Sequence, residues 1–146
     1  MIMDSAWHTD IARFVRHELG CRCPDEVFNT ISVNEHPEAF GSMRNACLVS
    51  IGGQLLILLI STRQWRSLAG RLDELFRQGR HLRDSGGFNR FRLVIATSDT
   101  AAADASLTQT FARLDDTDER LHLHVIQPAR LPDLGFEGFG ADPGVL

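Results

Sequence analysis

One uninterrupted aliphatic run limits what this chain can fold into more than any other feature of the sequence. Residues 55–60 read Leu-Leu-Ile-Leu-Leu-Ile, so a strand formed here is apolar on both faces and must be covered on both sides. The run is far shorter than the roughly 20 residues of a membrane-spanning helix. Gly52 and Gly53 separate it from a second β-rich run at residues 46–51, and a glycine pair at that position indicates a hairpin. The sequence therefore predicts a hairpin whose second strand is central in a sheet.

After the hairpin, the spacing of apolar residues alternates between the helix and strand periods. It predicts a long helix over residues 62–83, a strand over 91–97, a helix over 100–114 and a last strand over 121–126. Helices that connect successive strands imply parallel pairing with right-handed crossovers. We therefore expect this half of the chain to form a parallel βαβαβ unit that begins with the aliphatic run.

Before the hairpin, the sequence predicts a pair of helices. Apolar residues at helical spacing indicate a helix over residues 5–19, which Gly20 ends. Pro24 starts a second, short helix, because proline fits the first helical position. A strand is expected over residues 30–34.

Together these elements define a single α/β domain over residues 1–129. Its sheet is mixed, with an antiparallel hairpin beside parallel strands, and helices flank it. Residues 130–146 form a tail rich in Gly, Pro and Phe.

The residue types that the chain lacks exclude several kinds of active site. All 15 basic residues are arginine, and there is no tyrosine. Without lysine the chain cannot form a Schiff base or supply the lysine of a phosphate-binding loop, and without tyrosine it has no phenolic acid. The formal net charge of -4 also argues against general nucleic-acid binding, in which neutralisation of phosphates dominates the affinity.

The sequence shows neither an export signal nor a membrane span. Asp4, His8 and Asp10 lie where the apolar core of a signal peptide would be. We therefore expect a soluble, cytoplasmic protein, in which the three cysteines are not a disulfide framework.

The segment Gly20-Cys21-Arg22-Cys23-Pro24 is the strongest candidate for chemistry. Cys23 lies at the expected start of the short helix, where free backbone N–H groups and the helix dipole favour a thiolate. A disulfide between Cys21 and Cys23 would be strained and easily reduced. The motif predicts a redox thiol or part of a metal site. The alternative is that both cysteines are small packing residues at a helix–helix corner.

Cys47 and His36 could complete a tetrahedral zinc or iron site with this pair. However, the single residue between Cys21 and Cys23 is a shorter gap than metal ligands usually have. Cys47 also alternates with aliphatic residues along its expected strand, as a residue on a buried face does. The alternation favours a core position for Cys47.

His122 and His124 form a second candidate metal site. They are two residues apart in the last expected strand, so both side chains leave the same face of the sheet. With a third ligand from elsewhere they could hold one metal ion. The alternative is the polar face of an edge strand whose other face is apolar.

Ser98 and Asp99 follow the strand over residues 91–97 and are candidates for ligand binding. Ligands of open α/β sheets bind outside the carboxyl ends of the strands, at a topological switch point. The alternative is that these residues cap the helix that follows.

The sequence favours a binding or interaction module without catalytic activity. Its expected partner is another protein or a second copy of the chain, and neither a membrane nor nucleic acid is indicated. The contact surface could be the tail, with Phe136 and Phe139, or an arginine-bearing flank of the long helix. That flank comprises Arg63, Arg66, Arg77 and Arg80. The alternative function is a thiol-redox or metal-binding protein based on Cys21 and Cys23.

Overall fold

The computed structural model describes residues 5–20, 25–35, 37–41, 45–115 and 117–132, which form five strands, four α-helices and three short 3₁₀ helices. In chain order they are α1 (Ser5–His17), η1 (Asp25–Asn29), β1 (Ile31–Glu35), η2 (Glu38–Phe40), β2 (Ala46–Ile51), β3 (Leu55–Ser61), α2 (Trp65–Ala69), α3 (Leu72–Gly86), β4 (Arg90–Ala96), α4 (Thr100–Ala112), β5 (Leu121–Ile126) and η3 (Pro128–Arg130). None of these helices combines the length and the apolar character that crossing a bilayer requires.

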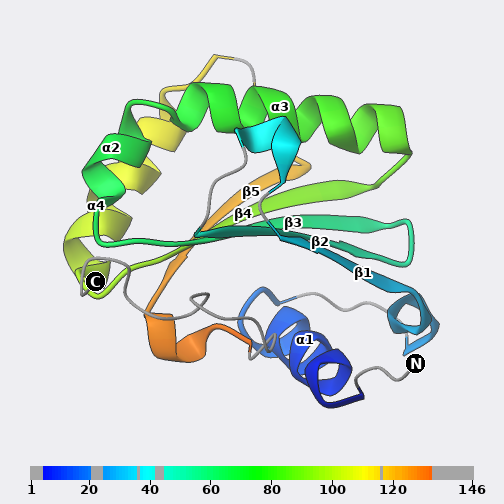
Figure 1. Cartoon of the computed structure of the whole chain (residues 1–146). Helices are drawn as coiled ribbons and strands as arrows, with labels where there is room; N and C mark the ends of the chain where they lie inside the picture. The colour runs from blue at the N-terminus through cyan, green and yellow to red at the C-terminus, as the bar shows by residue number, and fades with distance from the viewer. Residues whose placement is uncertain (1–4, 21–24, 36, 42–44, 116, 133–146) are drawn as a thin grey trace.

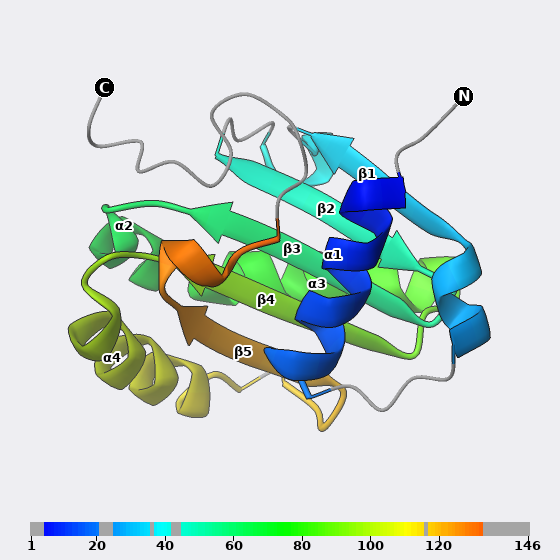
Figure 2. The same cartoon turned by 90° about the horizontal axis from the view of Figure 1, so that it is seen from below.

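The strands form one mixed sheet in the order β1-β2-β3-β4-β5. β1, β2 and β3 are antiparallel neighbours, whereas β3, β4 and β5 are parallel. α2, α3 and α4 lie on one face of the sheet and α1 lies on the other (Figure 1). Seen from below, α1 runs obliquely across its face, with its C-terminal end towards β4 and β5 (Figure 2). The predicted α/β fold, with an antiparallel hairpin and parallel strands flanked by helices, is confirmed.

The aliphatic run forms β3, which is buried at every position. Alternate residues of β3 belong to the core under α2, α3 and α4, and the others belong to the core under α1. Because each face of the sheet has its own core, the run needs no polar side.

The turn between β2 and β3 has the geometry that two glycines allow. Gly52 and Gly53 have φ values of 58° and 68°, in the left-handed region that a type I′ hairpin requires at both central positions. The backbone N–H of Gln54 donates to the carbonyl of Ile51 at 2.9 Å and closes the turn.

The prediction of one long helix over residues 62–83 is wrong, because two helices occupy this stretch. Gly70 lies between α2 and α3, and glycine is the weakest helix former apart from proline. The break lets α2 turn towards the core and bury Trp65. α3 then continues beyond the predicted end and is closed by Gly87, whose φ is 74°.

α3 packs closely on β4 because Gly79 has no side chain. A Cβ atom at this position would overlap the ring of Phe91, which is fully buried. The helix–sheet distance in this region therefore depends on a single glycine.

A half-buried ion pair that the sequence pattern does not predict connects α3 to the loop before β5. The side chain of Arg83 is 1% exposed, and it donates to both carboxylate oxygens of Asp118 at 2.9 Å. The hydrogen bond from Arg83 lowers the pKa of Asp118. Arg83 continues a stripe of buried residues at helical spacing. That stripe consists of Leu72, Leu75, Phe76 and Gly79.

Candidate functional site

Several residues singled out in the sequence lie outside the described part of the chain. They are Cys21, Cys23 and His36, with Phe136 and Phe139 of the tail. The thiol site therefore stays a prediction. The element that follows the two cysteines is η1, a 3₁₀ helix of five residues, rather than an α-helix with a full set of aligned backbone dipoles.

Cys47 is a core residue. It is fully buried on β2, among aliphatic side chains under α1. Burial and, in second place, the charge of Glu35 raise the pKa of its thiol to about 12, and such a thiol is a poor nucleophile and a poor ligand. No group of three His, Cys, Asp or Glu residues that could hold a metal ion occurs among the described residues. The structure thus supports the core position for Cys47.

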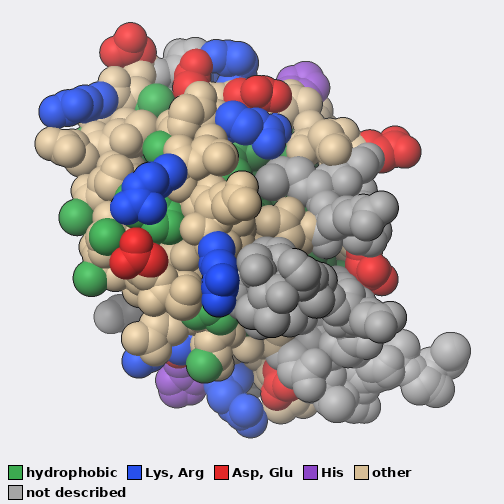
Figure 3. Space-filling view, turned by 60° about the vertical axis from the view of Figure 1, so that its left-hand side comes forward, with side chains coloured by type: hydrophobic (Ala, Val, Ile, Leu, Met, Phe, Trp, Pro, Cys, Tyr) green, Lys and Arg blue, Asp and Glu red, His purple; other side chains and the backbone are tan. Residues whose placement is uncertain are grey.

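Ser98 and Asp99 lie beyond the carboxyl end of β4, but this end of the sheet is not a topological switch point. The crossovers through α2–α3 and through α4 use the same face and step in the same direction across the sheet, so no crevice opens between them. Asp99 makes no side-chain capping bond to α4; its Oδ2 instead accepts the indole N–H of Trp65 at 3.3 Å. On the side that carries α2 and α4, arginine and acidic side chains are interspersed (Figure 3). The ligand site at Ser98 and Asp99 stays a prediction, without the support of a switch point.

His122 and His124 share the face of β5 that α1 crosses, and each forms a hydrogen bond with an arginine of β4. Arg92 is the direct neighbour of His122 in the parallel register, so Arg90 and Arg92 point to the same face as the histidines. Arg90 Nη1 lies 2.8 Å from His122 Nε2, and Arg92 Nη1 lies 2.9 Å from His124 Nε2. We call these four residues the Arg–His ladder.

The arginines determine the protonation state of the imidazoles. A guanidinium group only donates hydrogen bonds, so each Nε2 accepts and each neutral ring carries its proton on Nδ1. Burial, followed by the charges of Arg92 and Arg90, lowers the pKa of His122 to about 4. Burial, followed by Arg92 and His122, lowers the pKa of His124 to about 4. At neutral pH the ladder therefore has two positive charges, both on guanidinium groups.

No carboxylate in the described part of the chain pairs with these two guanidinium groups. Arg90 and Arg92 are both partly buried, and Nε of Arg92 is buried without a hydrogen-bond partner among the residues that the structure describes. Burial and the charge of Arg90 lower the pKa of Arg92. A cation withdrawn from water without a counter-charge is costly, and parallel N–H donors match the geometry of a carboxylate or a phosphate.

The metal site at His122 and His124 stays a prediction, and two features of the ladder argue against it. Both Nε2 lone pairs already accept hydrogen bonds from arginine. A metal cation at the histidines would also lie beside two guanidinium charges and be repelled by them. The prediction that the two side chains share a face is correct, and the neighbouring strand places two guanidinium groups beside them.

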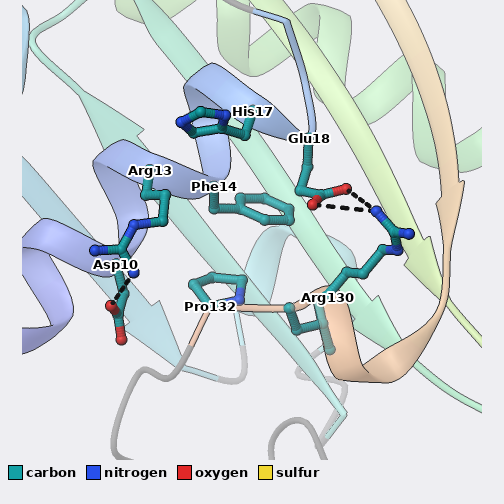
Figure 4. Close-up of a pocket in the computed structure, with 8 residues that line it drawn as sticks. Asp10, Arg13, Phe14, His17, Glu18, Arg130 and Pro132 are labelled. Atoms are coloured by element: carbon teal, nitrogen blue, oxygen red, sulfur yellow. Dashed lines mark hydrogen bonds and ion pairs between the residues drawn. The ribbon is translucent and has the colours of Figure 1, made fainter.

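A surface pocket of about 380 Å³ lies on the same side of the sheet, between α1 and the residues around η3 (Figure 4). It is lined by Asp10, Arg13, Phe14, His17, Glu18, Arg130, Leu131 and Pro132. Ion pairs join Arg13 to Asp10 at 3.6 Å and Arg130 to Glu18 at 3.3 Å. Because the arginines and acids of this pocket pair with each other, it lacks the unbalanced charge that distinguishes the ladder.

Comparisons of the chain with protein-family models, with curated proteins and with solved structures found no match.

Proposed function

We propose that this chain is a small binding module that holds an oxyanion, the phosphate or carboxylate group of a small ligand, on the Arg–His ladder. The single observation that carries the proposal is the buried Nε donor of Arg92. Among the described residues it has no hydrogen-bond acceptor, and no carboxylate there neutralises its guanidinium group.

The ladder has the chemistry of an anion site in a chain that is acidic overall. The formal net charge is -4, so the two positive charges, which lie two residues apart on β4, form a local cationic patch. The neutral imidazoles orient the guanidinium groups through Nε2 without adding a negative charge that would compete with the ligand. We infer binding rather than catalysis, because the ladder combines donors with neutral acceptors and includes no nucleophile.

Thermal unfolding in the presence of inorganic phosphate tests this proposal. At a dissociation constant of about 1 mM, about 20 mM phosphate would add about 1.8 kcal/mol to the free energy of unfolding, which raises the melting temperature by roughly 5 °C. Sodium chloride at equal ionic strength gives the screening baseline, and acetate and citrate show whether carboxylates bind as well as phosphate.

Arg92→Gln should abolish the phosphate-dependent part of the shift, because it removes the charge and the unpartnered donor. Arg77→Gln is the matched control, since Arg77 is exposed on α3 and paired with Asp73. In the wild type, phosphate should also move the NMR signal of the Arg92 Nε–H group. Equal melting shifts in the two variants, or no shift beyond the chloride baseline, would show that the ladder does not bind oxyanions.

A thiol-redox or metal-binding role based on Cys21 and Cys23 remains a separate prediction. Elemental analysis of freshly purified protein and titration of its thiols at several pH values test it. The role is excluded if no metal is found and the thiols react no faster than free cysteine.

A further inference from the structure

β1 lies at one edge of the sheet (Figure 2). Within the described part of the chain, β1 pairs with β2 alone. The carbonyl of Thr30 accepts from Gly52 at 2.7 Å, so the backbone groups of Ser32 and Asn34 also face β2, and those of Ile31 and Val33 face outwards. An edge strand of this kind presents a row of N–H and C=O groups that a further strand can pair with.

A groove lies beside this edge, on the face of the sheet that carries α3. Its volume is about 340 Å³. Side chains of Leu48, Leu56, Leu82 and Phe88 supply its apolar part, and Ser32, Asn34, Ser50, Ser85 and Gly86 supply the rest. None of these lining residues is ionisable, although 23% of the residues of the chain are charged.

We propose that the groove and the outer edge of β1 together bind an extended, uncharged peptide segment of a partner protein, which adds to the sheet as a sixth strand. The peptide backbone pairs with the outward-facing groups of Ile31 and Val33. Every second peptide side chain then lies on the face of Ser32 and Asn34 and enters the groove.

The lining determines which side chains fit. A charged side chain entering the groove would lose water without gaining a counter-charge, which is costly. Apolar side chains would cover the partly exposed Leu48 and Phe88, and the gain is proportional to the apolar area removed from water. The occupant is therefore neutral, with an apolar residue at every second position.

A second copy of this chain fits the groove less well. In a symmetric antiparallel pairing of two β1 strands centred on Val33, the residues opposite Ser32 and Asn34 are the partner's Asn34 and the partner's Ser32. These side chains are short and polar, so they would leave the apolar part of the groove unfilled.

The test uses the full chain and three capped synthetic peptides in which threonine alternates with leucine, glutamate or arginine. We expect the leucine peptide to bind, to shift the NMR signals of the Val33 amide and the groove residues, and to slow hydrogen exchange of that amide by at least about tenfold. Both charged peptides should bind at least about tenfold more weakly.

Two pairs of variants locate the binding site. Val33→Pro removes an outward-facing N–H, which an edge strand tolerates, and should weaken binding by about tenfold; Val33→Thr keeps the N–H and should not. Ser50→Glu places a charge in the groove and should weaken binding similarly, whereas Gln54→Glu places the same charge on the exposed turn and should leave binding unchanged.

Three results would overturn the inference. The first is the absence of binding by the leucine peptide, and the second is equal binding of the neutral and charged peptides. The third is sedimentation of the unliganded wild type as a dimer that Val33→Pro converts to a monomer, because this would assign the edge to a second copy of the chain. None of these outcomes bears on phosphate binding at the ladder, so the two proposals can fail separately.

Discussion

Protonation of the ladder should make the protein less stable as the pH falls from 6.5 towards 4. The pKa values of His122 and His124 are lowered from 6.5 to about 4 in the folded protein, so between these values the unfolded chain binds more protons than the folded one. The contribution of the two neutral histidines to the free energy of unfolding is fully present above pH 6.5 and is lost on acidification. Stability falls on acidification because the folded state lowers the pKa of these histidines. A histidine that the folded state stabilises in its charged form would have the opposite effect.

The size of this loss follows from the same values. Lowering the pKa from 6.5 to about 4 corresponds to about 3 kcal/mol for each histidine. Both side chains keep part of their surface in solvent, so screening reduces the interaction. We expect the free energy of unfolding to fall by about 2–4 kcal/mol in total between pH 7 and pH 4.5. The contribution of Asp118, whose pKa lies below its usual 3.8, is lost only at lower pH.

Urea denaturation followed by circular dichroism at half-unit pH intervals measures this loss. The double variant His122→Gln, His124→Gln retains a side-chain oxygen that accepts from each arginine and removes the titrating groups, so its stability should vary much less between pH 7 and pH 4.5. His81→Gln, an exposed change on α3, is the control and should retain the wild-type slope. The reasoning is refuted if the double variant loses as much stability on acidification as the wild type.

Three further predictions concern the packing of the fold. Gly79→Ala should lower the free energy of unfolding by about 2–4 kcal/mol, because the overlap of the new methyl group with a buried ring of β4 outweighs the gain in helix propensity of about 1 kcal/mol. Gly70→Ala should instead raise the free energy of unfolding by about 0.5 kcal/mol, because the atom nearest to the added Cβ is 3.8 Å away. Chemical denaturation measures both changes, and a change of the same sign in both variants would contradict the structure. Asp118→Ala should cost about 1–3 kcal/mol because it removes two hydrogen bonds to the buried guanidinium group of Arg83, which keeps only its pairing with Asp84, and a loss below about 0.5 kcal/mol in the same assay would disprove this. Cys47→Ala should leave unchanged the number of thiols that react rapidly with a thiol reagent in the native protein, because the pKa of Cys47 is raised to about 12; a lower count in the variant would show that Cys47 is accessible.

The fold was predictable where neighbouring residues alone determine the structure. The aliphatic run, the glycine pair before it and the alternation of helix and strand periods predict the central strand, the hairpin and the parallel crossovers, and all of these are present. The break at Gly70 was missed because the apolar stripe continues across it, and periodicity alone does not distinguish one long helix from two helices with aligned faces.

The candidate site was less predictable because it depends on how two strands are aligned. The sequence alone places His122 and His124 on one face, and the alternation of Arg90 and Arg92 with apolar residues places the arginines on one face of β4. Only the register shows that the two faces coincide and that Arg92 is the neighbour of His122. When β5 is considered without β4, the two histidines resemble metal ligands. Beside the arginines of β4, they are neutral hydrogen-bond acceptors for guanidinium groups.

The two proposed sites should act independently, because the sheet separates them. The ladder lies on β4 and β5, on the face that α1 crosses, whereas the groove lies beside β1 and β2 on the face that carries α3. Between them is β3, which is buried on both faces, and coupling across it would require an element with two discrete arrangements. We therefore expect Arg92→Gln to leave the affinity for the leucine peptide unchanged, within a factor of about two, and Ser50→Glu to leave the phosphate-dependent melting shift unchanged. Titration of each variant with the ligand of the other site measures this, and a coupling above about 1 kcal/mol would show that the sheet does not isolate its two faces.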